Sequence, residues 1–288
     1  MAFSFQSFKT RTLTAIVFVV IMLGGLLWNQ WSFLLLFSII HFGCWIEYQK
    51  LIKLIDADYK EVSTVHQFAI MFIGWGFMLW MTNSNYQIGS WSLSDIGWLI
   101  LTIALIAFVV NEYFINKKIL YQLTAHSLFG FIYISLSWGL MMQLWGNMDH
   151  KVFAGGQDWL MPVILIASIW INDTMAYLVG SFIGKTPFSA ISPKKTWEGT
   201  IGGAILAVLV ISVGGVYIFH FQAKPLLLIS ITAAIAGTAG DLLESKLKRM
   251  AGVKDSGQIM PGHGGFLDRF DSLLVATTIV SIVFYLFW

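Results

Sequence analysis

Charged and polar side chains gather in two stretches of this chain, both in its C-terminal part. The first stretch covers residues 172–199 and reads NDTMAYLVGSFIGKTPFSAISPKKTWEG. The second covers residues 240–271 and ends in KDSGQIMPGHGGFLDRFD. Only 11% of the residues of the whole chain are charged. Because charge is scarce elsewhere, these two stretches are the candidate places for chemistry.

Carboxylates in the second stretch recur at helical spacing. Asp241 shares a predicted helix face with Glu244 and Lys248, and Asp268 lies three residues before Asp271. Carboxylates close to several cations suit a hard divalent metal such as Mg²⁺, which completes its shell with water and substrate phosphate. Together with the neighbouring Lys and Arg residues, they indicate a site that holds polyphosphate and stabilises a phosphoryl-type transition state.

Glycines occupy much of the remaining second stretch. Gly257, Gly262, Gly264 and Gly265 permit positive φ and let backbone N–H groups approach a ligand closely. Such a loop before a helix that starts near Asp268 predicts an anion-binding cradle, although glycine-rich membrane loops can also be simple turns. A basic cluster that only senses anionic lipid is the alternative. It explains the cations but neither the carboxylates nor the glycines.

The first stretch begins inside an apolar segment. Asp173 lies about 21 Å along a helix that starts near Trp159, with Asn172 beside it. A carboxylate inside the membrane is costly and indicates a functional site, the alternative being a packing residue that bonds to a neighbouring helix. The later GSFIGKT, residues 180–186, has three residues between its glycines where a phosphate-binding loop has four. We therefore interpret it as a tight turn.

Two polar residues also occur early in the chain, in HFGCWIEY at 41–48. His41 lies on an apolar helix, where a single histidine is more often a packing residue than a ligand. Glu47 lies at the cytoplasmic end of the same predicted helix and is expected to meet water. Neither residue is assigned to the site.

The elements that must position these residues are apolar helices. The chain is 57% hydrophobic and contains 13 Trp residues, whereas about a quarter of the residues of a soluble domain are charged. The apolar runs are long enough to cross a bilayer as helices. They predict an all-α polytopic membrane protein with about nine transmembrane helices, near 12–28, 31–47, 65–82, 96–115, 119–145, 159–181, 199–220, 225–243 and 272–288. The first two segments, joined through Asn29 and Gln30, could instead be one broken helix or a re-entrant hairpin.

The distribution of Lys and Arg predicts the orientation of these helices. With a cytoplasmic N-terminus and a C-terminus on the opposite side, all of them except Lys151 and Lys224 fall on the cytoplasmic side. Both polar stretches then lie at the cytoplasmic end of the last four helices. The expected organisation is a single membrane domain, 1–288, in which 1–145 is mainly lipid-facing scaffold and 159–288 is the catalytic half. The single cysteine, Cys44, excludes a disulfide framework.

The segment SKLKRMAGVKDSGQIMPGHGGFLDRFD, Ser245–Asp271, closely resembles the signature of phosphatidate cytidylyltransferases, also called CDP-diacylglycerol synthases. Every fixed position of that signature matches, and the one departure is Met260, where another apolar residue is usual. The stretch 172–199 is similar to a second recurring segment of this family. The resemblance implies the reaction of CTP with phosphatidic acid to give CDP-diacylglycerol and pyrophosphate.

The resemblance also implies roles for individual residues. It places Mg²⁺, alone or with a second cation, on Asp241 and Asp268, with Asp271 and Asp173 as further ligands or orienting groups. The cations that would hold the phosphates of CTP and lipid are Lys194, Lys195, Arg249, Lys254 and Arg269, and Lys254 also belongs to the catalytic set. Lesser candidates for substrate contacts are Ser192, His263, Asn172 and Lys248.

The same resemblance implies the partners and the location. We expect CTP, phosphatidic acid in the bilayer, other membrane lipids and a second copy of the chain in a homodimer, but no nucleic acid. The location implied is a bacterial inner membrane, with the active site facing the cytoplasm. One rival is another CTP-dependent lipid enzyme, such as a polyprenol kinase. A secondary transporter is a second rival, but it predicts charges near the midplane and an inverted repeat, whereas the charges here gather at one face.

Overall fold

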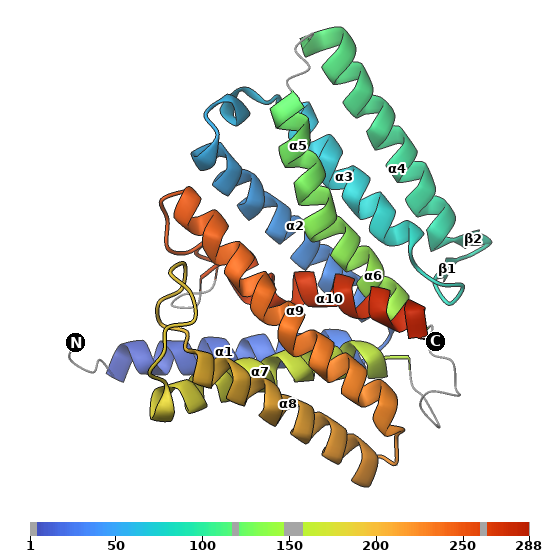
Figure 1. The fold of residues 1–288 in the computed structure, drawn as a ribbon. Coiled ribbons are helices and arrows are strands. Elements are labelled where there is room, and N and C mark those ends of the chain that lie inside the picture. Colours follow the sequence, from blue (N-terminus) through green and yellow to red (C-terminus); the bar gives the residue numbers. More distant parts are fainter. Residues whose placement is uncertain (1–4, 117–120, 147–157, 260–263, 288) are drawn as a thin grey trace. The chain divides into compact units, whose positions relative to one another are not determined.

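The computed structural model describes residues 5–116, 121–146, 158–259 and 264–287, and most of this part of the chain is helical (Figure 1). The helices are α1 (Phe5–Leu27), α2 (Gln30–Ile55), α3 (Thr64–Trp80), α4 (Leu93–Val110), α5 (Tyr121–Gly130), α6 (Leu136–Leu144), α7 (Leu160–Ile183), α8 (Trp197–Tyr217), α9 (Ala223–Met250) and α10 (Leu267–Phe287). Two short antiparallel strands, β1 (Gln87–Ile88) and β2 (Trp91–Ser92), connect α3 to α4. The prediction of an all-α protein is confirmed.

The apolar helices have the lengths that a bilayer requires. Within the described residues, seven helical segments are long and apolar enough to cross a membrane, and two shorter ones cover Thr12–Leu27 and Thr64–Trp80. Together they correspond to the nine predicted segments. The fifth segment is one helical run, Leu123–Leu144, in which a wider π-helical stretch, Phe131–Ser135, joins α5 to α6. The protein is therefore a polytopic integral membrane protein, while the orientation of its ends stays a prediction.

The junction between the first two segments separates two distinct helices. Asn29 has extended backbone geometry and caps the start of α2, because its side chain accepts hydrogen bonds from the backbone N–H groups of Trp31 and Ser32, both at 2.9 Å. The Ser32 hydroxyl lies 3.1 Å from the Asn29 backbone nitrogen and completes a capping box. Segments one and two are consequently separate helices.

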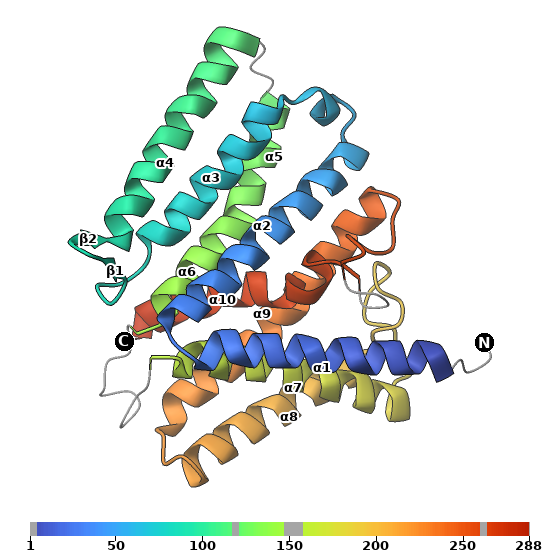
Figure 2. The same ribbon diagram turned by 180° about the vertical axis from the view of Figure 1, so that it is seen from behind.

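The chain forms two compact units that interleave in sequence. Unit one comprises Met1–Met142 and Leu247–Phe270. In it, α2, α3, α4 and the α5–α6 run lie side by side in both views (Figures 1 and 2). Aromatic side chains fill its interior: Trp45 and Trp138 are fully buried, and the Trp138 ring lies 5.1 Å from that of Phe37. Helices α3 and α4 can approach closely because Gly76 has no side chain. A Cβ atom there would lie 2.6 Å from the backbone nitrogen of Leu101.

Unit two comprises Gln143–Lys246 and Asp271–Trp288. Helices α7 and α8 run side by side along most of their length (Figures 1 and 2). Small residues allow this approach, since a Cβ atom at Gly203 would lie 2.7 Å from the backbone nitrogen of Ala176. Helix α8 begins at a Thr196 cap, whose side chain accepts from the Gly199 N–H.

Three helices extend beyond the apolar runs that predict them. Helix α2 continues to Ile55, α9 to Met250, and α10 begins at Leu267 rather than near 272. The added turns contain charged residues that interrupt the apolar runs, so hydrophobicity alone does not reveal them. They place five charged candidates on helix ends rather than in loops, namely Lys248, Arg249, Asp268, Arg269 and Asp271.

Candidate active site

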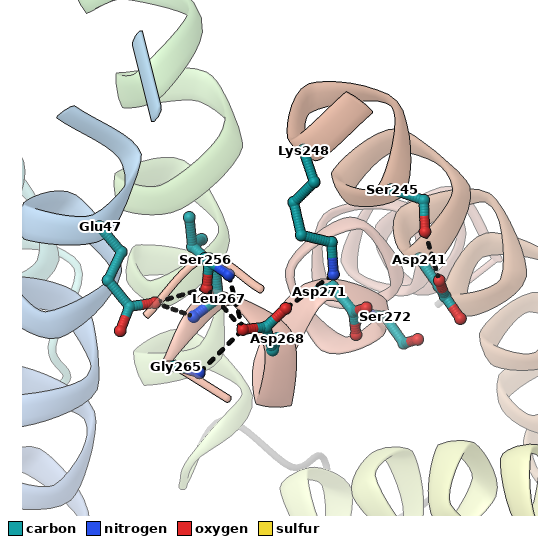
Figure 3. Close-up of polar contacts among 10 residues, drawn as sticks. All are labelled: Glu47, Asp241, Ser245, Lys248, Ser256, Gly265, Leu267, Asp268, Asp271 and Ser272. Carbon is teal, nitrogen blue, oxygen red and sulfur yellow. Dashed lines mark hydrogen bonds and ion pairs between the residues drawn. The ribbon is translucent and has the colours of Figure 1, made fainter. Parts of the chain in front are cut away.

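Asp268, in the first turn of α10, is the centre of a polar network in unit one (Figure 3). Its Oδ1 atom lies 2.7 Å from the Nζ of Lys248, near the end of α9. Its Oδ2 atom accepts from the N–H and hydroxyl of Ser256, at 2.8 and 2.9 Å, and from the Gly265 N–H at 2.8 Å. Asp268 thereby ties both ends of the described loop to the start of α10.

Glu47 on α2 binds the same loop, as Figure 3 shows. Its Oε2 atom accepts from the Ser256 hydroxyl at 2.7 Å and from the Leu267 N–H at 2.9 Å. The Ser256 hydroxyl therefore links Glu47 to Asp268. Glu47 is only 4% exposed, so the expectation that it meets water is wrong. Its helix continues two turns past it, and the loop covers its carboxylate.

The loop glycines serve two different purposes. Gly264 has φ of +85°, as predicted for this loop. Gly257 and Gly265 do not have positive φ; instead, a Cβ atom at either position would overlap the Glu47 carboxylate. These two glycines thus allow the loop backbone to lie directly against Glu47. Gly262 and the candidate residue His263 lie outside the described residues.

A second polar cluster lies in unit two. The Lys195 ammonium forms an ion pair with the Asp241 carboxylate, which also accepts from the Ser245 hydroxyl at 3.3 Å. Asp173 on α7 interacts electrostatically with both Lys195 and Asp241. The Asn172 amide, on a side chain that is 3% exposed, donates to Asp173 at 3.2 Å. Four predicted site residues, Asn172, Asp173, Lys195 and Asp241, are thus brought together from three segments of the chain.

The loop that carries Lys195 is fixed by a residue that the sequence analysis did not assign. The Glu198 carboxylate accepts from the Lys185 and Thr186 N–H groups, both at 3.2 Å, and from the Thr186 hydroxyl at 2.8 Å. Helix α7 continues to Ile183 and is capped by Gly184, so the first four residues of GSFIGKT are the end of a helix rather than part of a tight turn. An acidic residue in the first turn of a helix is the sequence signal that could have identified Glu198.

The remaining candidates lie at the surfaces of the two units. Lys194, Arg249, Lys254 and Arg269 are exposed, and Ser192 is half-buried. Asp271, one turn after Asp268 on α10, accepts from the Ser272 N–H at 2.6 Å. His41 is fully buried, and its Nε2 atom lies 3.1 Å from the Ser135 hydroxyl. It is therefore a packing residue, as expected.

The carboxylate donors have the chemistry that Mg²⁺ requires. Asp173 and Asp241 present oxygen ligands, and each interacts with Lys195, a monovalent cation that a divalent ion bound at the same carboxylates would replace. The Asp268 oxygens already receive one ammonium and three other donors. No group of three or more His, Cys, Asp or Glu side chains within the described ranges converges closely enough to form a complete protein-only metal site. Substrate phosphate or water would have to complete the shell.

Taken together, the fold and these clusters define a polytopic helical membrane protein with carboxylates and cations suited to phosphate chemistry. Comparison with known families identifies it further. The model of the cytidylyltransferase family matches residues 9–287, and the chain belongs to this family. It is therefore an enzyme of the nucleotidyltransferase class.

Several curated proteins share this sequence pattern. The chain is 29% identical over 284 residues to a phosphatidate cytidylyltransferase of Staphylococcus saprophyticus, covering 96% of this chain and 98% of that protein. Phosphatidate cytidylyltransferases of Staphylococcus haemolyticus and Staphylococcus epidermidis are 43% and 40% identical over 130 and 136 residues. Those matches cover 44% and 46% of this chain, and 49% and 52% of the two relatives.

Proposed function

We propose that this protein transfers the cytidylyl group of CTP to phosphatidic acid, giving CDP-diacylglycerol and pyrophosphate. The observation that carries the proposal is the similarity to a phosphatidate cytidylyltransferase over 96% of the chain. The organisation of the signature loop around Asp268 and Glu47 supports it, because the structure concentrates its polar contacts there.

The reaction asks for positioning rather than for a strong base. An oxygen of the lipid phosphate, ionised near neutral pH, attacks the α-phosphorus of CTP. The new P–O bond forms as the bond from the α-phosphorus to the bridging oxygen breaks, and pyrophosphate leaves with that electron pair. Two anions must be brought together and the negative charge of the departing group stabilised.

Cationic side chains of this chain meet that demand. Lys195 is held in place by Asp241 and directly precedes Thr196, the cap of α8, so it is a fixed point for a phosphate. The exposed cations Lys194, Arg249, Lys254 and Arg269 are proposed to bind the phosphates of CTP and lipid. Further contacts to the substrates are proposed for Ser192, His263, Asn172 and Lys248.

We propose Asp241 and Asp268 as ligands of Mg²⁺, with Asp271 and Asp173 as additional ligands or orienting groups. When bound, Mg²⁺ supplies positive charge to the phosphates and to the departing pyrophosphate. Asp241 and Asp268 would hold the metal in place of their ammonium partners, Lys195 and Lys248. Those ammonium groups would then be available to phosphate oxygens, which would explain why each proposed ligand carries a lysine.

The membrane setting is part of the proposal. We propose that the site faces the cytoplasm, where CTP is available, because nearly all Lys and Arg residues fall on that side of the predicted topology. The acyl chains would stay in the bilayer while the headgroup enters between helices. A homodimer in a bacterial inner membrane is proposed from the family resemblance alone.

The test is an assay of the purified protein with CTP, phosphatidic acid and Mg²⁺ in which both products are scored. CDP-diacylglycerol and pyrophosphate, formed in equal amounts and only with Mg²⁺ present, are the expected result. Release of CDP would show attack on the γ-phosphate, as in a polyprenol kinase, and would overturn the proposal. Solute flux without nucleotide in proteoliposomes would identify a transporter instead.

A further inference from the structure

A groove runs along α2 beside the signature loop, within unit one. Its volume is about 670 Å³, and both apolar and polar atoms line it. From α2 it is lined by Ile39, Phe42, Gly43, Ile46, Glu47 and Lys50, and from the loop by Gly257, Gln258, Ile259 and Phe266. The loop is docked tightly at this point, since a Cβ atom at Gly43 would overlap the Phe266 ring.

The α2 side of the groove is apolar along most of its length and charged at one end, as a phospholipid molecule is. Ile39, Gly43, Ile46 and Lys50 follow one another at spacings of three or four residues, so they form one stripe on the helix. The stripe is apolar for roughly 10 Å and then ends in an ammonium group. Ile39 and Ile46 are 53% and 46% exposed, which leaves the apolar part open to hydrocarbon.

A second groove, which has no charged side chain in its lining, serves as the comparison for a surface that only faces lipid. It lies between α3 and α4, has a volume of about 450 Å³, and is lined by apolar residues and Thr64 without any charged side chain. The α2 groove differs from it because it ends in charge and because the signature loop forms one of its walls. Of these two grooves, the α2 groove is therefore the one that offers a place for a charged headgroup beside the candidate active site.

We infer that the α2 groove binds an acyl chain of the phosphatidic acid substrate, and that the Lys50 ammonium binds its phosphate. Among the described residues, Lys50 has no carboxylate partner, whereas Lys195 and Lys248 are each paired with an aspartate. Its ammonium is thus available to an anion. The inference rests on the proposed function, because it assigns the lipid substrate of that reaction to one groove.

Glu47 is the one carboxylate in this groove and would oppose a phosphate. Its Oε2 atom is already occupied by the Ser256 hydroxyl and the Leu267 N–H. Lys50 lies one turn further along α2 and is exposed. The charge of Glu47 is therefore directed to the loop, and hydrogen bonds through Ser256 connect this wall of the groove to Asp268.

Removing the cation tests the headgroup contact. In micelles of a neutral detergent, Lys50→Gln should raise the KM for phosphatidic acid about tenfold, the usual loss of one charge-assisted contact, and leave the KM for CTP unchanged. Lys60→Gln is the matched control, because Lys60 is also exposed beyond the end of α2 but does not line the groove. An unchanged lipid KM, or equal rises for lipid and CTP, would contradict the inference.

Filling the groove tests the chain contact. Ile39→Trp should raise the KM for dioleoyl phosphatidic acid but not for the dihexanoyl lipid, whose chains are too short to occupy the stripe. Ile103→Trp fills the control groove, from a position that is 59% exposed, and should change neither value. Equal effects of the two tryptophan variants would mean that the groove only faces bulk lipid.

Binding of a fluorescent phosphatidic acid separates this inference from the proposed reaction. If the wild-type protein makes no CDP-diacylglycerol but binds the lipid in a Lys50-dependent way, the proposed function fails and the groove assignment stands. If the wild-type protein makes the product and binding does not depend on Lys50, the groove assignment fails alone. Equal weakening of phosphatidylglycerol and phosphatidic acid binding by Lys50→Gln would also overturn it, since the groove would then serve any anionic lipid.

Discussion

The Ser256 hydroxyl donates to the Glu47 carboxylate at 2.7 Å across 209 residues of chain. The same carboxylate oxygen accepts from the backbone of Leu267, where α10 begins. One buried acidic side chain of α2 thereby fixes both ends of the described signature loop. The early part of the chain contributes directly to the geometry of that loop, whatever other scaffold role it has.

Truncation of Glu47 should disorganise the loop without removing any proposed ligand. Glu47→Ala removes the acceptor of the Ser256 hydroxyl and of the Leu267 N–H, although the hydroxyl keeps its contact with Asp268. A lost bond to a charged group costs about 1.5–3 kcal/mol. We expect kcat/KM for CTP to fall about 10- to 100-fold, with the protein still inserted and folded by its thermal transition in detergent. The exposed Glu61 supplies the control, since Glu61→Ala should leave kcat/KM unchanged. Wild-type kinetics for Glu47→Ala would show that the contacts of Glu47 with the loop do not contribute to activity.

The glycine beside Glu47 gives a second prediction. Gly265→Ala should lower activity about tenfold or more, because overpacking a buried site costs about 1–3 kcal/mol and the added Cβ would overlap Glu47. Gly24→Ala is the control, since no atom lies within 4 Å of its added Cβ. In a double-mutant cycle with Glu47→Gly, Gly265→Ala should add little to the loss that Glu47→Gly causes alone. Additive losses would show that the clash with Glu47 is not the cause.

The sequence predicts the membrane helices well and the site only in part. Apolar runs of membrane-spanning length give all nine segments because backbone hydrogen bonding inside a bilayer leaves little alternative to helix. The contact of Glu47 with Ser256 could not be predicted, because a single acidic residue at a helix end carries no signal of its distant partner. The sequence also predicts positive φ for the loop glycines. Gly257 and Gly265 instead have glycine because the loop backbone packs directly against Glu47 at these positions.

The charged residues illustrate the same limit. Their types and spacing indicate phosphate chemistry, but the pairing of Lys195 with Asp241 and of Lys248 with Asp268 depends on tertiary structure. Hydropathy also ends α2 and α9 too early, since lysines and other charged residues interrupt the apolar pattern in turns that are still helical. The sequence thus predicts only part of the candidate site, since the contacts of Glu47 and Glu198 emerge from the fold, which also determines which charged residues meet.

The two adjacent lysines of the first polar stretch should not be equivalent. Lys195 pairs with Asp241 and interacts with Asp173, whereas Lys194 is exposed. Lys195→Ala should lower kcat/KM for CTP about 100-fold, the scale of losing one preorganised charge at a transition state. Lys194→Ala should cost no more than about tenfold, because an exposed cation is screened by solvent. Equal kinetics for the two variants would contradict a special role for the pair.

A buried network far from the signature loop predicts a pure stability effect. His66 is 1% exposed, with Nδ1 3.0 Å from Glu112 and Nε2 2.7 Å from the Ser127 hydroxyl. His66→Phe removes both contacts and should destabilise the protein by about 1–3 kcal/mol, which lowers its thermal transition. Activity of the folded fraction at low temperature should stay at the wild-type level, as expected if this region is scaffold. Val65→Ala, at a half-exposed neighbour, should change neither property.

Asp268 gives the sharpest test of the metal proposal, because Lys248 and a metal would compete for the same Oδ1 atom. Asp268→Asn should lower turnover about 100-fold or more, and raising Mg²⁺ should not restore it. Lys248→Met frees Oδ1 from its ammonium partner, so the Mg²⁺ concentration at half-maximal activity should fall, even if kcat also falls. Titrations of activity against Mg²⁺ measure both effects, with thermal transitions to show that the variants are folded. If Asp268 only shapes the loop, Lys248→Met will leave the Mg²⁺ dependence at its wild-type position, and the ligand assignment is then wrong.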